Sequence, residues 1–181
     1  MKYSFGLLVI IMMAACSAPH VASTTTVAGA NLSKYKTFGF YEIKASGDTL
    51  PEFFNERVGY LKEAITNELT KKGYQKSTQP ELFINIGIVV KEEVQTREMN
   101  WMTDGRYRYT GQRNYTWQAG EVEVGRYRNG TVTLHIVEVA SNNMLWQGTV
   151  EKVIPDRKDK VVQVINEGMS KLFAGFSSSS K

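Results

Sequence analysis

The sequence, 181 residues long, predicts a single α+β domain in which a mostly antiparallel sheet carries two amphipathic helices on one face. Two segments place apolar residues three and four apart, the spacing of a helical face, and four segments have the alternation or the aromatic content of strands. Their order is strand, helix, strand, strand, strand, helix. Helices gathered on one face of an antiparallel sheet bury that face, so we expect the other face to remain open.

The first strand and the first helix are predicted within residues 34–73. The segment 34–42, KYKTFGFYE, is rich in aromatic residues and bounded by polar ones, which is typical of a strand. Beyond Pro51 the apolar residues fall on one helical face, and they are Phe54, Val58, Leu61, Ile65 and Leu69. Gly73 supplies a left-handed stop for this helix.

Three strands and a second helix complete the predicted domain. The segment 81–94, ELFINIGIVVKEEV, alternates apolar residues with others and predicts the longest strand. The segment 130–154 predicts an antiparallel pair, because Asn142 and Asn143 can adopt the positive φ angles of a tight turn. Asp156 can then cap a helix with an inward face formed by Val161, Ile165, Met169, Leu172 and Phe176.

The N-terminal residues predict an exported and lipidated chain. A basic start precedes an apolar run over residues 5–15, about half of the roughly 20 residues that a membrane-spanning helix needs, as in a secretory signal peptide. Ala14 and Ala15 directly before Cys16 resemble the lipobox of bacterial lipoproteins, where cleavage precedes a cysteine that becomes acylated. Acylation would account for a single cysteine in an exported chain. The alternative is an ordinary signal peptide cut nearby, which leaves Cys16 free.

These features divide the chain into four parts. Residues 1–15 are the predicted lipoprotein signal peptide, and residues 16–30 are the lipidated cysteine with a flexible tether, because SAPHVASTTTVAGA is small and polar. Residues 31–176 form the single α+β domain. Residues 177–181 are a disordered tail rich in serine.

The sequence contains no recognisable catalytic, metal-binding or cofactor-binding motif, so we expect no catalytic residues, no cofactor and no metal. His135 is the one histidine inside the predicted domain, and neither a Gly-x-Ser-x-Gly elbow nor a phosphate-binding Gly-x-x-x-x-Gly-Lys occurs. Zinc needs several cysteine or histidine ligands at short spacing, which this chain lacks. The net charge of +4 is mild and argues against a nucleic-acid partner.

Two carboxylate pairs keep an enzymatic alternative open. They are Glu92 with Glu93 and Glu121 with Glu123. Such pairs could serve a hydrolase or transferase that acts on envelope polymers. The neighbouring cations favour plain cross-strand ion pairs instead, and these cations are Lys91, Arg126 and Arg128.

A segment that interleaves arginine with tyrosine and tryptophan predicts a binding surface. The pattern runs through 97–118 and returns in GRYRNG at 125–130. Arginine and large aromatic residues are enriched at interface hot spots and can bind proteins or stack on sugars. The predicted surface consists of Arg106, Tyr107, Arg108, Tyr109, Arg113, Tyr115, Trp117, Arg126 and Arg128. The alternative is a long hairpin whose aromatic side chains pack on the sheet while the arginines stay solvated.

Three blocks of the sequence resemble a known family. YKTFGFYE, PELFINIGIVVKEEVQTRE and YRNGTVTLHIVEVASNNMLWQGTVEKVI are similar to the bacterial lipoproteins grouped as domain of unknown function 4136. In the last block a Gly-Thr opens one strand and a Trp-x-Gly, Trp146 and Gly148, lies on the returning strand. The resemblance implies an envelope lipoprotein and no established activity. From the residues themselves we expect Trp146 and Gly148 to be structural, since tryptophan buries a large surface and glycine permits close approach.

Together these observations predict a membrane-anchored envelope lipoprotein with a binding or structural domain and no enzymatic activity. We expect the anchor to carry fatty acyl chains such as palmitate. Ser17, directly after the cysteine, resembles the residue that directs bacterial lipoproteins to the outer membrane. We therefore expect an outer-membrane anchor and a domain that faces the periplasm. The expected partners are the membrane and an envelope protein or glycan, and no nucleic acid.

Overall fold

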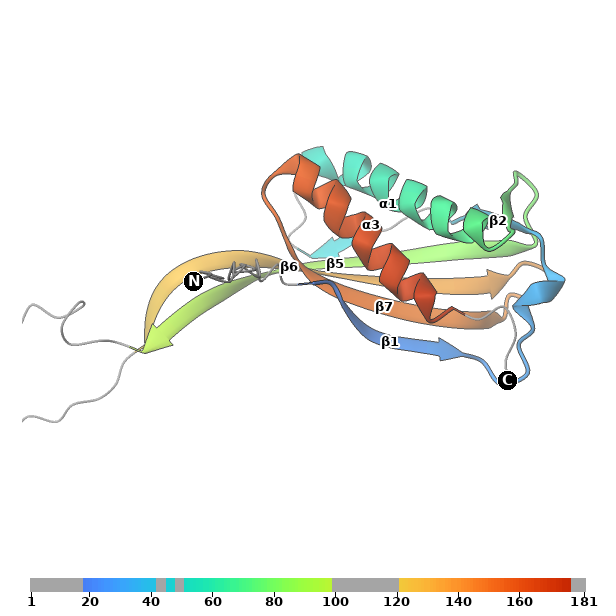
Figure 1. The fold of residues 1–181 in the computed structure, drawn as a ribbon, viewed down its shortest axis with the longest axis horizontal. Coiled ribbons are helices and arrows are strands. Elements are labelled where there is room, and N and C mark those ends of the chain that lie inside the picture. The colour runs from blue at the N-terminus through green and yellow to red at the C-terminus, as the bar shows by residue number, and fades with distance from the viewer. Residues whose placement is uncertain (1–17, 42–44, 48–50, 99–120, 177–181) are drawn as a thin grey trace, which may run out of the picture.

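The computed structural model describes residues 18–41, 45–47, 51–98 and 121–176, and its elements are arranged as an α+β sandwich (Figure 1). The strands are β1 (His20–Thr26), β2 (Thr37–Phe40), β3 (Ala45–Gly47), β4 (Gln75–Lys76), β5 (Leu82–Glu98), β6 (Glu121–Glu138) and β7 (Met144–Ile154). The helices are a short 3-10 turn η1 (Leu32–Lys34), α1 (Pro51–Lys71) and α3 (Lys158–Ala174).

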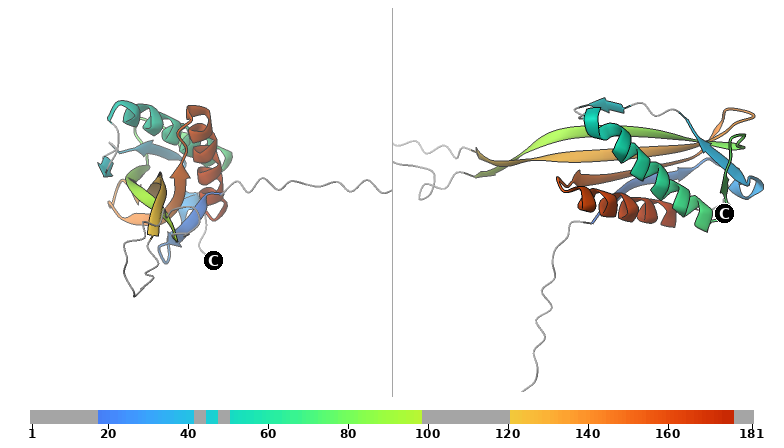
Figure 2. Two further views of the ribbon diagram at one scale, coloured as in Figure 1. Left: turned by 90° about the vertical axis from the view of Figure 1, so that its left-hand side faces the viewer. Right: turned by 90° about the horizontal axis from the view of Figure 1, so that it is seen from above.

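The strands form one seven-stranded sheet with the order β1-β7-β6-β5-β2-β4, and β3 pairs with β5 outside this path. The long pairings β5–β6, β6–β7 and β1–β7 are antiparallel, whereas the short strands β2, β3 and β4 pair in parallel. Both helices lie on the same face of the sheet (Figures 1 and 2). The predicted fold class, a mostly antiparallel α+β domain with two helices on one face, is therefore confirmed.

The hydrophobic core lies between the helices and the sheet. In β5 the buried side chains alternate, and Leu82, Ile84 and Ile86 point to the helices. The inward faces of the two helices match the predicted spacing, with buried Leu61, Ile65 and Leu69 in α1 and buried Val161, Met169 and Leu172 in α3. Full burial of one such side chain stabilises the fold by about 1.5–3 kcal/mol. Apolar periodicity is thus the main determinant of which faces pack together.

The ends of the helices agree only partly with the sequence-based expectations. Gly73, with φ of +90°, follows α1 as the expected left-handed stop. Asp156 does not cap α3, because the residue that precedes the helix is Arg157, and Arg157 makes no side-chain capping hydrogen bond. Asp156 instead accepts a hydrogen bond from Arg128. No helix in the described part of the chain is long and apolar enough to cross a membrane.

Strand β1 differs from the flexible tether predicted for residues 16–30. His20–Thr26 pairs antiparallel with β7, and the amide of Val27 continues this pairing by donating to the carbonyl oxygen of Leu145 at 2.9 Å. The tether was predicted because the segment contributes few apolar side chains to the core, Val21 among them. Its threonines nevertheless suit an extended backbone, and the edge of β7 provides hydrogen-bond partners. The folded domain therefore begins before residue 31.

Strands β5 and β6 continue past the helices as a two-stranded ribbon (Figure 1). The pairing shifts by a bulge between Gln95 and Thr96. Val94 and Val124 are 50% and 47% exposed in this ribbon. Because no helix covers the ribbon, these two valine side chains are exposed to solvent.

A candidate ligand-binding cavity between the helices and the sheet

Most of the predicted arginine and aromatic surface, from Arg106 to Trp117, lies outside the described residues. Of that surface, Arg126 and Arg128 are described. Each of these two arginines contacts a carboxylate. Arg126 Nε donates to Glu123 Oε1 at 2.7 Å, and Arg128 Nη2 donates to Asp156 Oδ1 at 2.8 Å. The two arginines are therefore engaged in ion pairs, and the one tyrosine between them points to the opposite face of β6.

Two of the four acidic residues that could have supported catalysis, Glu93 and Glu123, are held by local partners. Glu93 accepts hydrogen bonds from the hydroxyl of Tyr127 at 2.6 Å and from the amide of Asn129 at 3.5 Å, rather than from the arginines expected across the strands. The hydrogen bond from Arg126 lowers the pKa of Glu123. Within the described ranges, no three His, Cys, Asp or Glu side chains come together as metal ligands.

His135 lies half-buried in β6 on the face of the sheet opposite the helices. The residues beside it in register are Asn85 of β5 and Gln147 of β7. Neither is a nucleophile or a carboxylate, and a catalytic triad needs both beside its histidine. The two residues directly beside His135 in register therefore supply neither of these groups.

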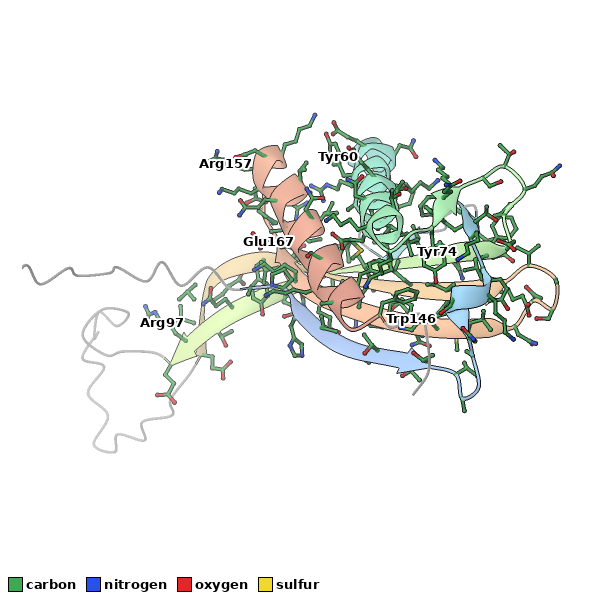
Figure 3. All side chains as sticks on the ribbon, turned by 45° about the vertical axis from the view of Figure 1, so that its right-hand side comes forward. Tyr60, Tyr74, Arg97, Trp146, Arg157 and Glu167 are labelled. Atoms are coloured by element: carbon green, nitrogen blue, oxygen red, sulfur yellow. The ribbon has the colours of Figure 1, made fainter. Side chains whose placement is uncertain are left out.

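Trp146 and Gly148 lie in the core at one end of the sandwich (Figure 3). The indole is fully buried, stacks on Phe173 at 5.7 Å between ring centroids and meets Phe176 edge-on at 5.3 Å. A Cβ atom added to Gly148 would lie 2.3 Å from the indole Cη2 and 2.9 Å from Leu172 Cδ1. Only glycine leaves room for the ring there, so both residues pack as structural elements.

The opposite end of the core is less filled. Along α3 the inward side chains shrink from Phe173 and Leu172 to Gly168 and Val161. A Cβ atom on Gly168 would find its nearest neighbour, Val150 Cγ2, only at 3.7 Å. The small side chains of Gly168 on α3 and Val150 on β7 therefore leave unfilled space between helix and sheet. The aromatic end of the core is filled by its rings.

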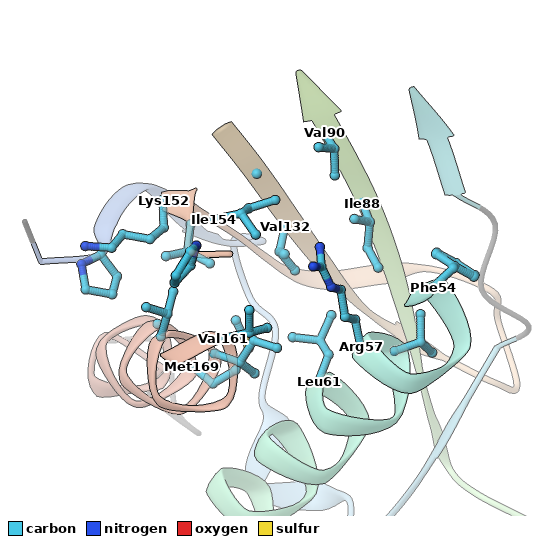
Figure 4. Close-up of a pocket in the computed structure, with 18 residues that line it drawn as sticks. Phe54, Arg57, Leu61, Ile88, Val90, Val132, Lys152, Ile154, Val161 and Met169 are labelled. Carbon is cyan, nitrogen blue, oxygen red and sulfur yellow. The ribbon is translucent and has the colours of Figure 1, made fainter. Parts of the chain in front are cut away.

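This space is an apolar cavity of about 120 Å³ between α1, α3 and the sheet (Figure 4). The side chains around it are almost all aliphatic, and they include Leu61, Ile88, Val132, Val150, Val161 and Met169. Every strand residue in this set lies on the helix-facing side of the sheet, as strand alternation requires. The strand side chains that line the cavity thus belong to the same inward-facing set that forms the hydrophobic core.

Two cationic side chains, Arg57 from α1 and Lys152 from β7, stand among the aliphatic residues that line the cavity (Figure 4). Arg57 also lines an adjoining polar hollow together with Arg128 and Lys158. Burial is the largest cause that lowers the pKa of Arg57, and the nearby charge of Arg128 adds to it. The cavity thus combines an apolar interior with two cationic side chains, Arg57 and Lys152, which reach its lining from different elements.

Carboxylates in the adjoining hollow offset part of this charge. Asp156 pairs with Arg128, and Glu56 pairs with Lys158. The named groups around the cavity and the hollow comprise four cations, Arg57, Arg128, Lys152 and Lys158, against the two carboxylates Glu56 and Asp156. The lining of the cavity and of the hollow therefore carries two more cations than carboxylates.

Sequence reasoning missed this cavity. The signal that could have revealed it is Gly168 in the middle of an otherwise regular helical pattern, because a glycine costs about 1 kcal/mol inside a helix and calls for a packing reason. A second signal is the decrease in side-chain size along the inward face of β7, from Trp146 to Val150. Neither signal says what the space contains.

Comparison with known proteins gives a family and a fold. The family model described as Domain of unknown function (DUF4136) matches residues 22–176. No curated protein matches the chain. A PDZ domain protein from Parabacteroides distasonis shares 17% identity at a TM-score of 0.50 over 88% of this chain, which spans 37% of that protein. At this identity the likeness concerns the fold alone.

Two further solved structures are similar at lower scores. The PelC dodecamer from Paraburkholderia phytofirmans shares 12% identity at a TM-score of 0.46, over 87% of this chain and 96% of its own. A putative neuraminyllactose-binding hemagglutinin homolog from Helicobacter pylori shares 16% identity at a TM-score of 0.41, over 77% and 80%. Both scores are too low to carry an argument about this chain.

Proposed function

This chain belongs to the family Domain of unknown function (DUF4136), and from that premise we propose that it is a lipid-anchored protein of the bacterial cell envelope whose domain binds an apolar ligand and catalyses no reaction. The observation that carries the binding function is the aliphatic cavity between α1, α3 and the sheet. Small-molecule sites are typically concave and apolar, with a few polar groups that orient the ligand. The cavity has this composition.

The composition of the walls favours an apolar ligand in this space. The space is partly open at the surface, and an apolar ligand would replace the water in contact with its aliphatic walls. The chain retains Gly168 at the wall, although alanine would fit there and form a better helix. A binding function explains why a fold would keep such a space.

The binding proposal can be tested with a neutral fluorescent probe such as N-phenyl-1-naphthylamine. We expect saturable binding to the native chain and its loss in Val132→Phe, because the phenyl ring would occupy the cavity. Val89→Phe is the matched control, since Val89 lies on the neighbouring strand and is 37% exposed. Equal binding by both variants, or no saturable binding by the native chain, would disprove the proposal.

The anchor proposal rests on the basic and apolar start of the chain and on Ala14-Ala15-Cys16. We propose acylation of Cys16, anchoring in the outer membrane and a domain that faces the periplasm. Cells fed an alkyne analogue of palmitate should label the native chain and not Cys16→Ser. A native chain that acquires no label, or a Cys16→Ser chain that keeps it, would exclude the anchor.

The non-catalytic part of the proposal is supported by the state of the candidate carboxylates. A general acid needs a pKa raised towards neutrality, whereas the contact with Arg126 lowers the pKa of Glu123. Glu123→Gln should therefore leave any phenotype of the native chain unchanged. A complementation assay in a deletion strain measures this, and loss of function in Glu123→Gln would favour the hydrolase or transferase alternative.

A second candidate function is contact with an envelope protein or glycan through the β5–β6 ribbon. The exposed valines Val94 and Val124 on a ribbon that extends past the helices favour it. A photo-crosslinking residue at Val124 in living cells should give a discrete adduct, and one at Lys62 on α1 should not. Identical patterns at the two positions would count against a specific contact at the ribbon.

A further inference from the structure

We propose that the free edge of β6 in the ribbon pairs antiparallel with the same edge of a second copy of this chain, so that two ribbons form one four-stranded sheet. The inference is independent of the cavity. It rests on the second candidate function only in naming a second copy as the protein that the ribbon contacts. Three features lead to it: a free strand edge, a charge pattern that is complementary to itself, and a bulge that brings the charges to one face.

The edge of β6 becomes free where β7 ends. β7 pairs with β6 as far as Ile154, which lies opposite Arg128, and Pro155 follows directly. Proline has no N–H group with which to continue the pairing. On its other side β6 pairs with β5 as far as Glu121, so among the described residues 121–127 have a neighbouring strand on one side only. Such an edge offers its N–H and C=O groups to another strand.

The charges along this edge are complementary to their own reverse. The segment 121–128 reads EVEVGRYR, with its acidic half before its basic half. We place a two-fold axis between Val124 and Gly125, and the strand then runs antiparallel to its copy. In this register Glu123 of each copy lies opposite Arg126 of the other, and opposite charges across antiparallel strands attract. A second copy of the chain therefore supplies the charges that this edge requires.

The bulge in β6 makes this register possible. Side chains that lie directly opposite one another on antiparallel strands share a face, whereas residues three apart on a regular strand point to opposite faces. Two consecutive residues of β5 lie opposite Gly125 and Glu123, so Val124 is the extra residue of the bulge. Glu123 and Arg126 are thereby brought to one face, in agreement with the 2.7 Å between Oε1 and Nε. Without the bulge the self-pairing would set each charge against the wrong face.

The apolar residues of the edge also match in this register. Val122 of each copy lies opposite Tyr127 of the other, and a β-branched residue beside an aromatic one is a favourable cross-strand pair. Val124, which is 47% exposed, meets its own copy across the axis. Association therefore covers apolar side chains that contact solvent in the single chain.

The present contacts of the two charges allow this exchange. The ion pair between Glu123 and Arg126 lies within one strand, and the two side chains are 47% and 60% exposed. Exposed ion pairs contribute little to stability. Exchange of the pair within one strand for the same pair between copies leaves every carboxylate with a cation beside it. The backbone hydrogen bonds of the new strand pair are then a gain.

The shape of the molecule leaves room for this contact. The ribbon projects past the helices (Figures 1 and 2), so antiparallel pairing places the two helical layers at opposite ends of the shared sheet. The pairing covers residues 122–127, since the place opposite Arg128 belongs to Ile154. A contact of about 20 Å along the strand is small and weak in solution, and anchoring in one membrane raises the effective concentration of the copies. The test therefore uses the full chain in membranes.

A disulfide across the two-fold axis is the first arm of the test. In the proposed register the Cα atoms of the two Val124 residues lie about 6 Å apart, within the range that a disulfide spans. Copper phenanthroline added to membranes should link Val124→Cys into a dimer. Val94→Cys is the matched control, because Val94 is 50% exposed on β5, away from this edge. The native chain gives the background from Cys16. Equal linking at both positions, or none above background in Val124→Cys, would overturn the proposal.

Charge reversal in the Val124→Cys chain is the second arm. Glu123→Arg and Arg126→Glu each set like charges opposite one another and should lower the yield of linked dimer about fivefold. Co-expression of the two variants, with tags of different size, should restore a linked dimer that contains one copy of each. The ion pair within the strand stays broken in both variants, so only contact between copies can restore the yield. A mixture that links no better than either variant alone would overturn the proposal.

The remaining outcomes separate this inference from the proposed functions. Glu63→Arg, on the exposed side of α1, changes the net charge as Glu123→Arg does and should leave the yield unchanged. An equal loss in both would overturn the specific contact at β6. A photo-crosslink from Val124 to a different protein, without a disulfide-linked dimer, would keep the ribbon as a contact surface and overturn the second copy as its partner. Probe binding in the cavity is measured separately and is independent of either result.

Discussion

The ring of Trp146 occupies space that any side chain at position 148 would need. A Cβ atom there would lie 2.3 Å from Cη2 of the indole, and Phe173 and Phe176 hold the ring in place on its other sides. Gly148→Ala should therefore destabilise the fold by about 1–3 kcal/mol, the range for overpacked cores. Urea unfolding followed by tryptophan fluorescence measures the change.

Gly87→Ala is the matched control for that substitution. It also lies inside a long strand, but a Cβ atom there would meet its nearest neighbour, the carbonyl oxygen of Thr133, at 3.7 Å. Alanine inside a strand is favoured over glycine by roughly 0.5–1 kcal/mol. The two substitutions should thus shift the unfolding midpoint in opposite directions, and equal shifts would refute the close approach at Gly148.

Glu81 links β2 to β5 through its carboxylate. Oε2 accepts hydrogen bonds from the amides of Lys36 at 2.7 Å and Thr37 at 3.0 Å, and from the hydroxyl of Thr37 at 3.1 Å. The two backbone hydrogen bonds are the main cause that lowers the pKa of Glu81 below 4.5. The carboxylate therefore connects β2 to β5 in its ionised form.

The lowered pKa predicts a specific dependence of stability on pH. A group with a lower pKa in the folded state stabilises the fold fully above its unfolded pKa, and this contribution disappears as the pH falls through the folded value. Glu81→Gln should thus be less stable than the native chain at pH 7, and the difference should shrink below pH 4.5. Urea midpoints measured from pH 7 to pH 3 test this, and a constant difference would contradict it.

At the scale of elements, helices and strands with a regular apolar pattern could be predicted from the sequence, whereas polar or very short strands could not. The helices α1 and α3 and the strand β5 carry unbroken 3.6- or 2-residue periods, so their inward faces follow from the sequence. The parallel strands β3 and β4 are three and two residues long, too short to show a period. β1 is polar, and only its partner β7 makes it a strand. The cavity depends on what the side chains leave unfilled, which no local pattern records.

Strand β1 gives a prediction at this scale. If the threonine-rich segment pairs with β7, its amides should exchange with solvent more slowly than those of an unfolded tether. Hydrogen exchange measured by mass spectrometry on a peptide that covers residues 20–27 should show protection, including that of the Val27 amide bonded to Leu145. Exchange at the unfolded rate throughout this peptide would restore the tether interpretation.

The whole molecule has two different ends. One end holds the aromatic core, where Tyr74 and Trp146 lie (Figure 3), and the turn between β6 and β7. The other end holds the N-terminal ends of both helices, the cavity and the projecting β5–β6 ribbon (Figures 1 and 4). Pro19, the second described residue, lines the cavity at this latter end. The densely packed aromatic end is thus separated from the end that carries the cavity and the ribbon.

This polarity predicts how an anchored chain stands on a membrane. An acylated Cys16 would hold Pro19 within about 11 Å of the surface, whereas α1, with 21 residues, extends about 30 Å towards the other end. A fluorophore on Arg157→Cys, at the start of α3, should therefore be quenched by spin-labelled lipid headgroups much more than one on Ala140→Cys, in the turn after β6. The acylated chain in vesicles is suitable because lipid occupies its native cysteine and only the introduced thiol reacts. Equal quenching at both sites would mean that the domain lies flat or tumbles freely, and the cavity would then have no fixed relation to the membrane.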